Sequence, residues 1–249
     1  MPDRGETPVS TIFTGERWSI QRFVSGFANN AFLITCIRTG KSVIVDTPAA
    51  PDELIAAARA TSVGAVLITH GHQDHLEGFA AVIGEFNVPV GIGADDRGSL
   101  PGPVQKLPEL LDIATGNLIG AGDITLRPVA TPGHTPGSTC FMLGRSPGPD
   151  AVLESGTVSG TRDPTSKNAI SHVFTGDTLF PGGPGRSGSP QALKQMLDSI
   201  KTHILTLPDS TVVLPGHGEF TTVGASRREH AAFAARPLDP DLSGDVTWT

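Results

Sequence analysis

The sequence of 249 residues lacks several features that would each indicate a particular class of protein. It has no tyrosine, only two cysteines and no block of lysine or arginine, and its net charge is −7. An acidic chain without a basic patch argues against nucleic acid and against an anionic membrane surface as partners. No apolar run reaches the length of a membrane span, and residues 1–7 show no basic segment leading into an apolar stretch. We therefore expect a cytoplasmic protein with neither a nucleic-acid nor a membrane partner.

The two cysteines, Cys36 and Cys140, each lie inside an apolar run that is typical of a strand. Two thiols fall short of the cysteine-rich ligand sets that structural zinc sites prefer. Because we expect a cytoplasmic protein, two buried free thiols are a better prediction than a disulfide.

Glycine and proline, in contrast, are abundant, with 30 and 21 residues placed mostly in turns between short apolar runs. Residues 11–46 predict a succession of strands, and helices alternate with strands farther along the chain. The helices are expected at residues 51–60, 75–86, 189–205 and 225–235. This alternation indicates crossover connections around a sheet with parallel strand pairs, which is an α/β class.

The distribution of polar residues predicts how the chain is organised beyond its regular elements. We expect a single domain over residues 1–249. Residues 144–171 are polar and predict a surface loop, and residues 237–249 predict a loosely held tail.

A compact group of side chains that can bind metal follows the apolar run at residues 65–68. Three imidazoles and one carboxylate occur within six residues, namely His70, His72, Asp74 and His75. If the chain leaves the strand extended, His70 and His72 point to one side and can reach one ion. Asp74 and His75 diverge from that pair as the chain turns toward a helix, so they suit a neighbouring ion. Imidazole with carboxylate and no thiolate favours zinc, iron or manganese in a hydrolytic or oxygen-handling site.

Three further apolar strands end in a similar way, with a glycine followed by His134, Asp177 or His217. In sheets with helical crossovers, ligands gather at the carboxyl ends of the strands, so these residues are expected to converge. Each of them alone would be an ordinary turn residue. Together with the first group they complete a ligand set.

The order of these residues, His70-Gly71-His72-Gln73-Asp74-His75 and then His134, Asp177 and His217, resembles the metallo-β-lactamase-fold hydrolase superfamily. The motifs around the last three residues are Thr-Pro-Gly-His134-Thr-Pro-Gly-Ser, Thr-Gly-Asp177-Thr-Leu-Phe and Pro-Gly-His217-Gly. These motifs most resemble the glyoxalase II-like branch of the superfamily, especially its short bacterial members without a C-terminal helical domain. The resemblance implies an α/β fold of four layers, an αβ/βα sandwich, with a dinuclear metal site at one edge of two sheets. It implies one ion on His70, His72 and His134, another on Asp74, His75 and His217, and a bridge between them made by Asp177 and a hydroxide.

The implied activity is that of a metal-dependent hydrolase similar to hydroxyacylglutathione hydrolase, acting on a small molecule with two divalent ions. Zinc is the expected metal, with iron or manganese as alternatives, and Asp74 and Asp177 are the expected catalytic carboxylates. A thiolate leaves without protonation because its thiol is already fairly acidic, whereas an amine must be protonated. Lactonases of the superfamily commonly place a tyrosine near the leaving group, and this chain has none. These considerations favour a thioester, although metal-bound water or Asp74 could serve as the acid that other leaving groups need.

Other activities and two residues stay open at this point. A mono-iron persulfide dioxygenase, a β-lactamase or a lactonase would share the fold, and a non-catalytic binding protein is a third class. Arg186 either holds the loop after Asp177 or meets an anionic substrate, and in that loop Gly188 replaces the family's usual aspartate. Asp46 either orients a ligand histidine or caps the turn that follows it.

Overall fold

The computed structural model describes residues 9–102, 109–114, 117–145, 170–237 and 239–248. Its main strands form two six-stranded sheets, and each sheet mixes parallel and antiparallel pairs. The first sheet has the order β1 (Ser10–Thr14), β2 (Trp18–Ser25), β3 (Asn29–Cys36), β4 (Lys41–Val45), β5 (Ser62–Leu67) and β6 (Val90–Gly91). The second sheet has the order β14 (Thr221–Thr222), β13 (Val212–Pro215), β10 (Ile170–Gly176), β9 (Thr139–Arg145), β8 (Ile124–Ala130) and β7 (Ile119–Ala121). A small hairpin joins β11 (Leu179–Phe180) to β12 (Gly183–Pro184).

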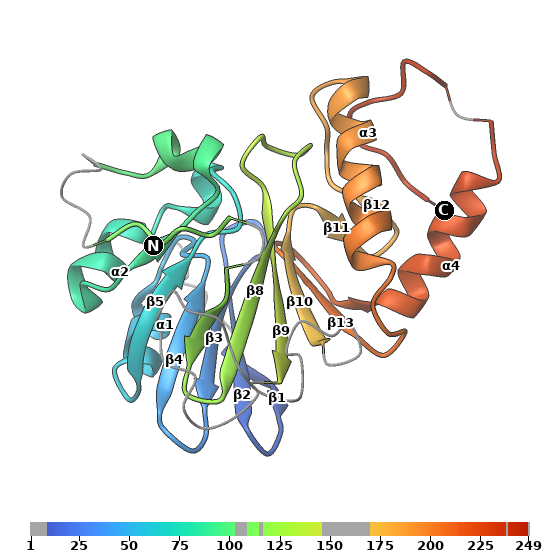
Figure 1. The fold of residues 1–249 in the computed structure, drawn as a ribbon. Helices are drawn as coiled ribbons and strands as arrows, with labels where there is room; N and C mark the ends of the chain where they lie inside the picture. The colour runs from blue at the N-terminus through green and yellow to red at the C-terminus, as the bar shows by residue number, and fades with distance from the viewer. Residues whose placement is uncertain (1–8, 103–108, 115–116, 146–169, 238, 249) are drawn as a thin grey trace, which may run out of the picture.

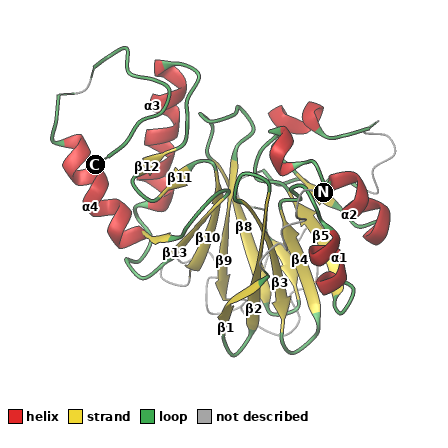
Figure 2. Ribbon diagram, turned by 180° about the vertical axis from the view of Figure 1, so that it is seen from behind, coloured by secondary structure: helices red, strands yellow, loops and turns green. Residues whose placement is uncertain are grey.

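Helices cover the outer face of each sheet. Helices α1 (Asp52–Ala58) and α2 (Phe79–Phe86) lie on the first sheet, and α3 (Pro190–Ser199) and α4 (Val223–Ala234) lie on the second. Figures 1 and 2, which view the molecule from opposite sides, both show the strands between these two pairs of helices. The expected four-layer αβ/βα sandwich is therefore confirmed.

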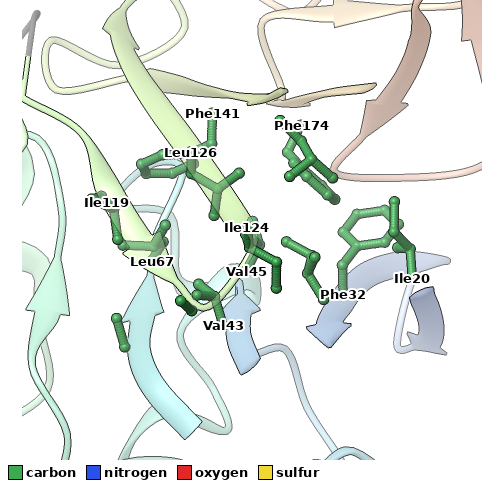
Figure 3. Close-up of a cluster of buried hydrophobic side chains, with 14 of the residues drawn as sticks. Ile20, Phe32, Val43, Val45, Leu67, Ile119, Ile124, Leu126, Phe141 and Phe174 are labelled. Carbon is green, nitrogen blue, oxygen red and sulfur yellow. The ribbon is translucent and has the colours of Figure 1, made fainter. Parts of the chain in front are cut away.

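The alternation of side chains along each strand explains the layers. On β3, Phe32 and Ile34 point toward the second sheet, whereas Ala31 and Leu33 point toward the helices. Successive side chains of a strand point to opposite faces, so a strand buried on both faces is apolar throughout. Figure 3 shows the cluster between the sheets, where Phe32 lies near Phe174 of β10. Each fully buried side chain of this size contributes about 1.5–3 kcal/mol to folding.

The strand directions decide where the site forms. Strand β5 runs parallel to β4 and β6 in the first sheet, and β13 runs parallel to β10 in the second. Strand β9 is antiparallel to both β8 and β10, so β8 and β10 share a direction. The loops that carry the predicted metal ligands follow β5, β8, β10 and β13.

Several predicted helices differ in their bounds or change their hydrogen-bonding pattern along their length. The helix expected at 75–86 is a 3₁₀ turn at Gln73–His75 and then α2. The helix expected at 189–205 is α3 followed by one π-helical turn at Ile200–Ile204. The predicted loop at 144–171 begins and ends within β9 and β10, and its interior, residues 146–169, lies outside the described residues.

The C-terminal segment differs from the loose tail expected at 237–249. Trp248 is fully buried, and its ring meets those of His230 and Phe233 on α4. The backbone N–H of Trp248 donates to Gly182, and Gly244 and Ser187 exchange two backbone hydrogen bonds. The expectation of a loose tail was wrong for residues 244–248, because Gly244 and Trp248 contact residues that lie far from them in the sequence.

The expected single domain over residues 1–249 stays a prediction, although elements from both halves of the chain share the cluster between the sheets. Within the described parts of the chain, every helix is too short or too polar to cross a membrane.

Candidate metal centre

The loop after β5 brings the first group of histidines to the sheet edge. Thr69 continues the strand, and its N–H and hydroxyl both donate to the carboxylate of Asp46, at 2.8 Å each. The chain then turns through Gln73–His75, where the N–H of His75 donates to the carbonyl of His72 at 3.1 Å. This tight turn reverses His75 toward the strand from which His70 departs.

The structure brings all seven predicted metal ligands together. Groups of three that each lie within 4.8 Å are His70, His72 and His134; His70, His75 and Asp177; and Asp74, His75 and His217. We call the first of these the three-histidine triad and the last the Asp74 triad.

Each triad is compact at its nitrogen and oxygen atoms. In the three-histidine triad, Nδ1 of His72 lies 2.8 Å from Nε2 of His134 and 3.1 Å from Nε2 of His70. In the Asp74 triad, Nε2 of His217 lies 3.2 Å both from Nε2 of His75 and from Oδ2 of Asp74.

Asp177 lies between the two triads. Its Oδ2 is 3.5 Å from Nε2 of His134 on one side and 3.5 Å from Nε2 of His217 on the other. Its Oδ1 is shielded from solvent and has no hydrogen-bond partner among the described residues. A buried carboxylate oxygen without a donor is costly unless something positive meets it.

In four of the histidines, the hydrogen-bond partner of Nδ1 indicates whether Nε2, which faces the site, carries a lone pair. His75 Nδ1 contacts Asp46, His134 Nδ1 contacts the carbonyl of Arg186 and His217 Nδ1 contacts the carbonyl of Phe27. His70 Nδ1 contacts the hydroxyl of Thr69, which already gives its proton to Asp46. Because these oxygens accept, each Nδ1 carries the proton and each Nε2 faces inward with a free lone pair.

This arrangement fits cations. Two lone pairs on neutral imidazoles cannot hydrogen-bond to each other, so Nε2 of His75 and Nε2 of His217, which lie 3.2 Å apart, need positive charge between them. A histidine whose outer nitrogen donates to an oxygen has the tautomer found in protein metal sites. The donor set of imidazole and carboxylate suits zinc, iron or manganese.

Electrostatics at the site point the same way. Burial, followed by the charge of His75, holds the pKa of His70 well below its ordinary value. Burial alone would also lower the pKa of His75, but Asp46 and Asp177 outweigh it and raise that pKa to about 10. The negative potential that would hold a proton on His75 would equally hold a metal ion. Burial would raise the pKa of Asp177, but His217 and His75 keep it well below its usual range.

Comparison with known proteins identifies the family. A family model described as the Metallo-beta-lactamase superfamily matches residues 24–146. An uncharacterized protein of Mycobacterium tuberculosis is 35% identical over 182 residues, which cover 66% of this chain and 73% of that protein. The chain belongs to the metallo-beta-lactamase superfamily. A probable hydroxyacylglutathione hydrolase of Schizosaccharomyces pombe is 34% identical over 209 residues, covering 80% of this chain and 68% of that protein.

A solved structure has a similar fold. The crystal structure of TTHA1623 in a di-iron-bound form matches with a TM-score of 0.57 and 26% identity, covering 82% of this chain and 95% of that chain.

In this superfamily member, side chains behind the seven residues hold them in place. Asp46 meets Nδ1 of His75 at 3.0 Å, so of its two predicted roles the structure favours orienting a histidine. Arg186 contributes its carbonyl to His134 at 2.8 Å, while the residue as a whole is exposed.

Two buried polar residues escaped the sequence analysis. Asn29 is 2% exposed and donates from Nδ2 to Oδ2 of Asp74 at 2.9 Å. Asp96 is 5% exposed and contacts the loops of His72 and His134. The signals were weak: Asn29 precedes an apolar strand, and Asp96 lies in a segment without regular periodicity.

Proposed function

We propose that this chain is a dinuclear metal-dependent hydrolase that cleaves a thioester of a small molecule, in the manner of a hydroxyacylglutathione hydrolase. The three-histidine triad would hold one divalent ion and the Asp74 triad the other, with Asp177 between them. Zinc is the proposed metal, with iron as the alternative. A cytoplasmic location stays a prediction from the sequence.

The observation that carries this proposal is the common tautomer of four histidines. His70, His75, His134 and His217 each anchor Nδ1 on an oxygen and turn Nε2 inward. Histidines that only fill space have no reason to aim their lone pairs at one small volume. The position of Asp177 between both triads further supports two ions rather than one.

Relatives support the reaction and the number of metals. The related protein of Schizosaccharomyces pombe carries the name probable hydroxyacylglutathione hydrolase, and the structurally similar TTHA1623 was solved with two irons. The second of these keeps iron open as the native metal.

When bound, the two ions would lower the pKa of water to near neutrality and polarise the carbonyl of the substrate. The chain's own residues hold the geometry for this chemistry. Asn29 fixes the carboxylate of Asp74, whose side chain is 39% exposed and so accessible to a leaving group. Asp46 holds His75, and the carbonyl of Arg186 holds His134, so the imidazoles are preorganised.

The leaving group favours a thioester. No tyrosine exists to protonate an alkoxide or an amine, and Asp74 is the exposed acidic side chain among the predicted ligands. Because a thiolate departs without a proton, the chain needs no dedicated acid for it.

Metal analysis combined with substrate profiling tests the proposal. We would measure metal content by mass spectrometry and the turnover of S-lactoylglutathione, simple thioesters, lactones and a chromogenic lactam. We expect two ions per chain and faster turnover of thioesters than of lactones or the lactam. The metal-free protein serves as the inactive control.

Two results would contradict the proposal. One equivalent of iron together with oxygen consumption on persulfides would favour a mono-iron dioxygenase. Preferred hydrolysis of the lactam or the lactones would keep the metal centre but replace the substrate class.

A further inference from the structure

One buried carboxylate joins the two loops of the three-histidine triad. Asp96 lies in the short 3₁₀ helix η2 (Ala94–Ser99). Its Oδ2 accepts from the N–H of Gly71 at 2.7 Å and from the hydroxyl of Thr135 at 2.6 Å. Its Oδ1 accepts from the N–H of Gly137 at 2.9 Å. Gly71 separates His70 from His72, and Thr135 follows His134, so Asp96 contacts both loops directly beside their imidazoles.

The direction of the neighbouring hydrogen bonds shows that Asp96 must accept. The backbone N–H of Thr135 donates to the hydroxyl of Ser138 at 3.0 Å. The two hydroxyls of Thr135 and Ser138 lie 2.8 Å apart. Since Thr135 gives its proton to Asp96, Ser138 gives its own to Thr135, and each polar hydrogen has one acceptor. The carboxylate of Asp96, which can only accept, completes this series of hydrogen bonds.

Glycines make room for Asp96 between three backbones. A Cβ on Gly137 would lie 2.6 Å from Cγ of Asp96, and a Cβ on Gly71 would lie 2.6 Å from the hydroxyl oxygen of Ser99. A Cβ on Gly93 would collide with the carbonyl oxygen of Gly137. Such close packing leaves the loops no freedom to change their spacing independently.

The Asp74 triad has separate support. Asn29 holds Asp74, Asp46 holds His75 and the carbonyl of Phe27 holds His217. None of the three hydrogen bonds of Asp96 reaches these side chains. A change at Asp96 should therefore act on one triad and spare the other.

We propose that Asp96 is a positioning residue that sets the spacing of the three-histidine triad, and so the affinity of one of the two ions. This inference rests on the two-ion site of the proposed function but on none of its substrate chemistry.

The first test compares Asp96→Asn with Asp95→Asn. Asparagine keeps the volume of Asp96 but, in either orientation, turns one acceptor into an N–H donor that faces another donor. Asp95 is its exposed neighbour, so Asp95→Asn makes the same charge change without touching the loops. Protein loaded with two equivalents of zinc is titrated with a chelator, and bound metal is counted at each step. We expect Asp96→Asn to lose one ion at a chelator concentration about tenfold or more below that for wild type, with the other ion unchanged.

A second pair of variants keeps the test independent of the charge at Asp96. Thr135→Val removes the hydroxyl that donates to Asp96 and should weaken the same ion. Thr135→Ser retains the hydroxyl and should bind metal as wild type does.

Double variants identify which ion is affected. Added to His217→Ala, which impairs the Asp74 triad, Asp96→Asn should leave no tightly held ion. Added to His134→Ala, which already impairs the three-histidine triad, it should cause no further loss.

The outcomes separate this inference from the proposed function. Wild-type chelator resistance in Asp96→Asn would overturn the inference. So would equal loss of both ions with a large fall in the melting temperature of the metal-free protein, because that is a general structural defect. A wild type that binds two ions yet hydrolyses no thioester would instead overturn the proposed function alone. If wild type holds a single ion, only the two-ion part of that function fails, and Asp96→Asn must still weaken the ion to support the inference.

Discussion

At the scale of single residues, Asp177 is a carboxylate that lies between the two triads. Its carboxylate is 3.5 Å from His134 and from His217, and one of its oxygens is buried without a partner among the described residues. Four of the five predicted histidine ligands, His70, His75, His134 and His217, are anchored at Nδ1 by an oxygen behind them. The carboxylate therefore depends most on charge that the protein chain itself does not supply.

Replacing Asp177 with asparagine tests this dependence. Asparagine retains the shape but is neutral, so two ions brought close together would lose the charge that offsets their repulsion. We expect Asp177→Asn to lose at least one ion and to lower thioester turnover by about 100-fold or more. Metal content and kcat measure the effect, with exposed Asp198→Asn on α3 as the control. Two tightly bound ions and normal turnover in Asp177→Asn would rule out a bridging role.

His172 predicts a pH dependence that is unrelated to the metal ligands. It is 4% exposed, its ring packs edge-on against Phe13, and burial lowers its pKa from 6.5 to about 4. The unfolded chain takes up this proton below pH 6.5, whereas the folded chain resists until about pH 4. Stability is therefore present above pH 6.5 and is lost as the pH falls toward 4, by roughly 3 kcal/mol in all.

The variant His172→Leu isolates this contribution. Urea unfolding of the metal-free wild type and variant between pH 7 and pH 4.5 gives the free energy of unfolding at each pH. We expect the wild type to lose more stability than the variant on acidification. Parallel curves would show that His172 takes up its proton as readily in the folded as in the unfolded protein.

At the scale of elements, the C-terminal segment supports a loop of the site. Gly244 pairs through its backbone with Ser187, and the adjacent carbonyl of Arg186 accepts from His134. Trp248 anchors the segment between α4 and the loop at Gly182. A series of contacts therefore connects Trp248, near the end of the described chain, with the loop that supports His134, a predicted metal ligand.

Truncating the anchor should cost both stability and metal affinity. We expect Trp248→Ala to lower the free energy of unfolding by about 3–5 kcal/mol, the usual cost of emptying a buried tryptophan site. We also expect weaker binding of the ion held by His134, since the loop at Ser187 loses its support. Chemical unfolding and chelator titration measure the two effects, and Asp245→Asn, an exposed neighbour, is the control. Unchanged stability would mean that the segment is only loosely attached.

At the scale of the whole molecule, the site joins the two sheets. His70, His72 and His75 follow β5 of the first sheet, and His134, Asp177 and His217 follow strands of the second. The apolar cluster between the sheets does not include any of these residues. The core should therefore persist without metal, while the edge of the sandwich loosens.

Removal of the ions tests this separation. We expect a metal-free protein to keep its far-ultraviolet circular dichroism but to unfold at a lower temperature. A ligand present at 100 times its dissociation constant stabilises a protein by about 2.7 kcal/mol, so the shift should grow with added metal. Calorimetry with and without chelator measures it. A melting temperature that is the same with and without metal would show that no ion bridges the sheets.

Much of the fold was predictable because the determining signals are local. Strands with apolar residues on both faces, such as residues 65–68, indicate burial between layers, and the alternation with helices indicates the α/β class. The seven candidate ligands were also predictable, because each follows the end of an apolar strand and parallel strands end at one edge.

What only the tertiary structure decided depends on contacts between distant segments. Asp46, Asn29 and Asp96 contact the loops or side chains of the candidate ligands across 25 to 45 positions of sequence. No local pattern distinguishes Asn29 and Asp96 from ordinary polar residues, and the two roles predicted for Asp46 are separated only by its contact with His75. The anchoring of Trp248 likewise depends on α4, which a reading of the tail alone cannot supply. Side-chain periodicity is a property of neighbours along the chain. Which residues become hydrogen-bond partners depends on which segments lie close together in the folded protein, and that is decided only when the two sheets pack.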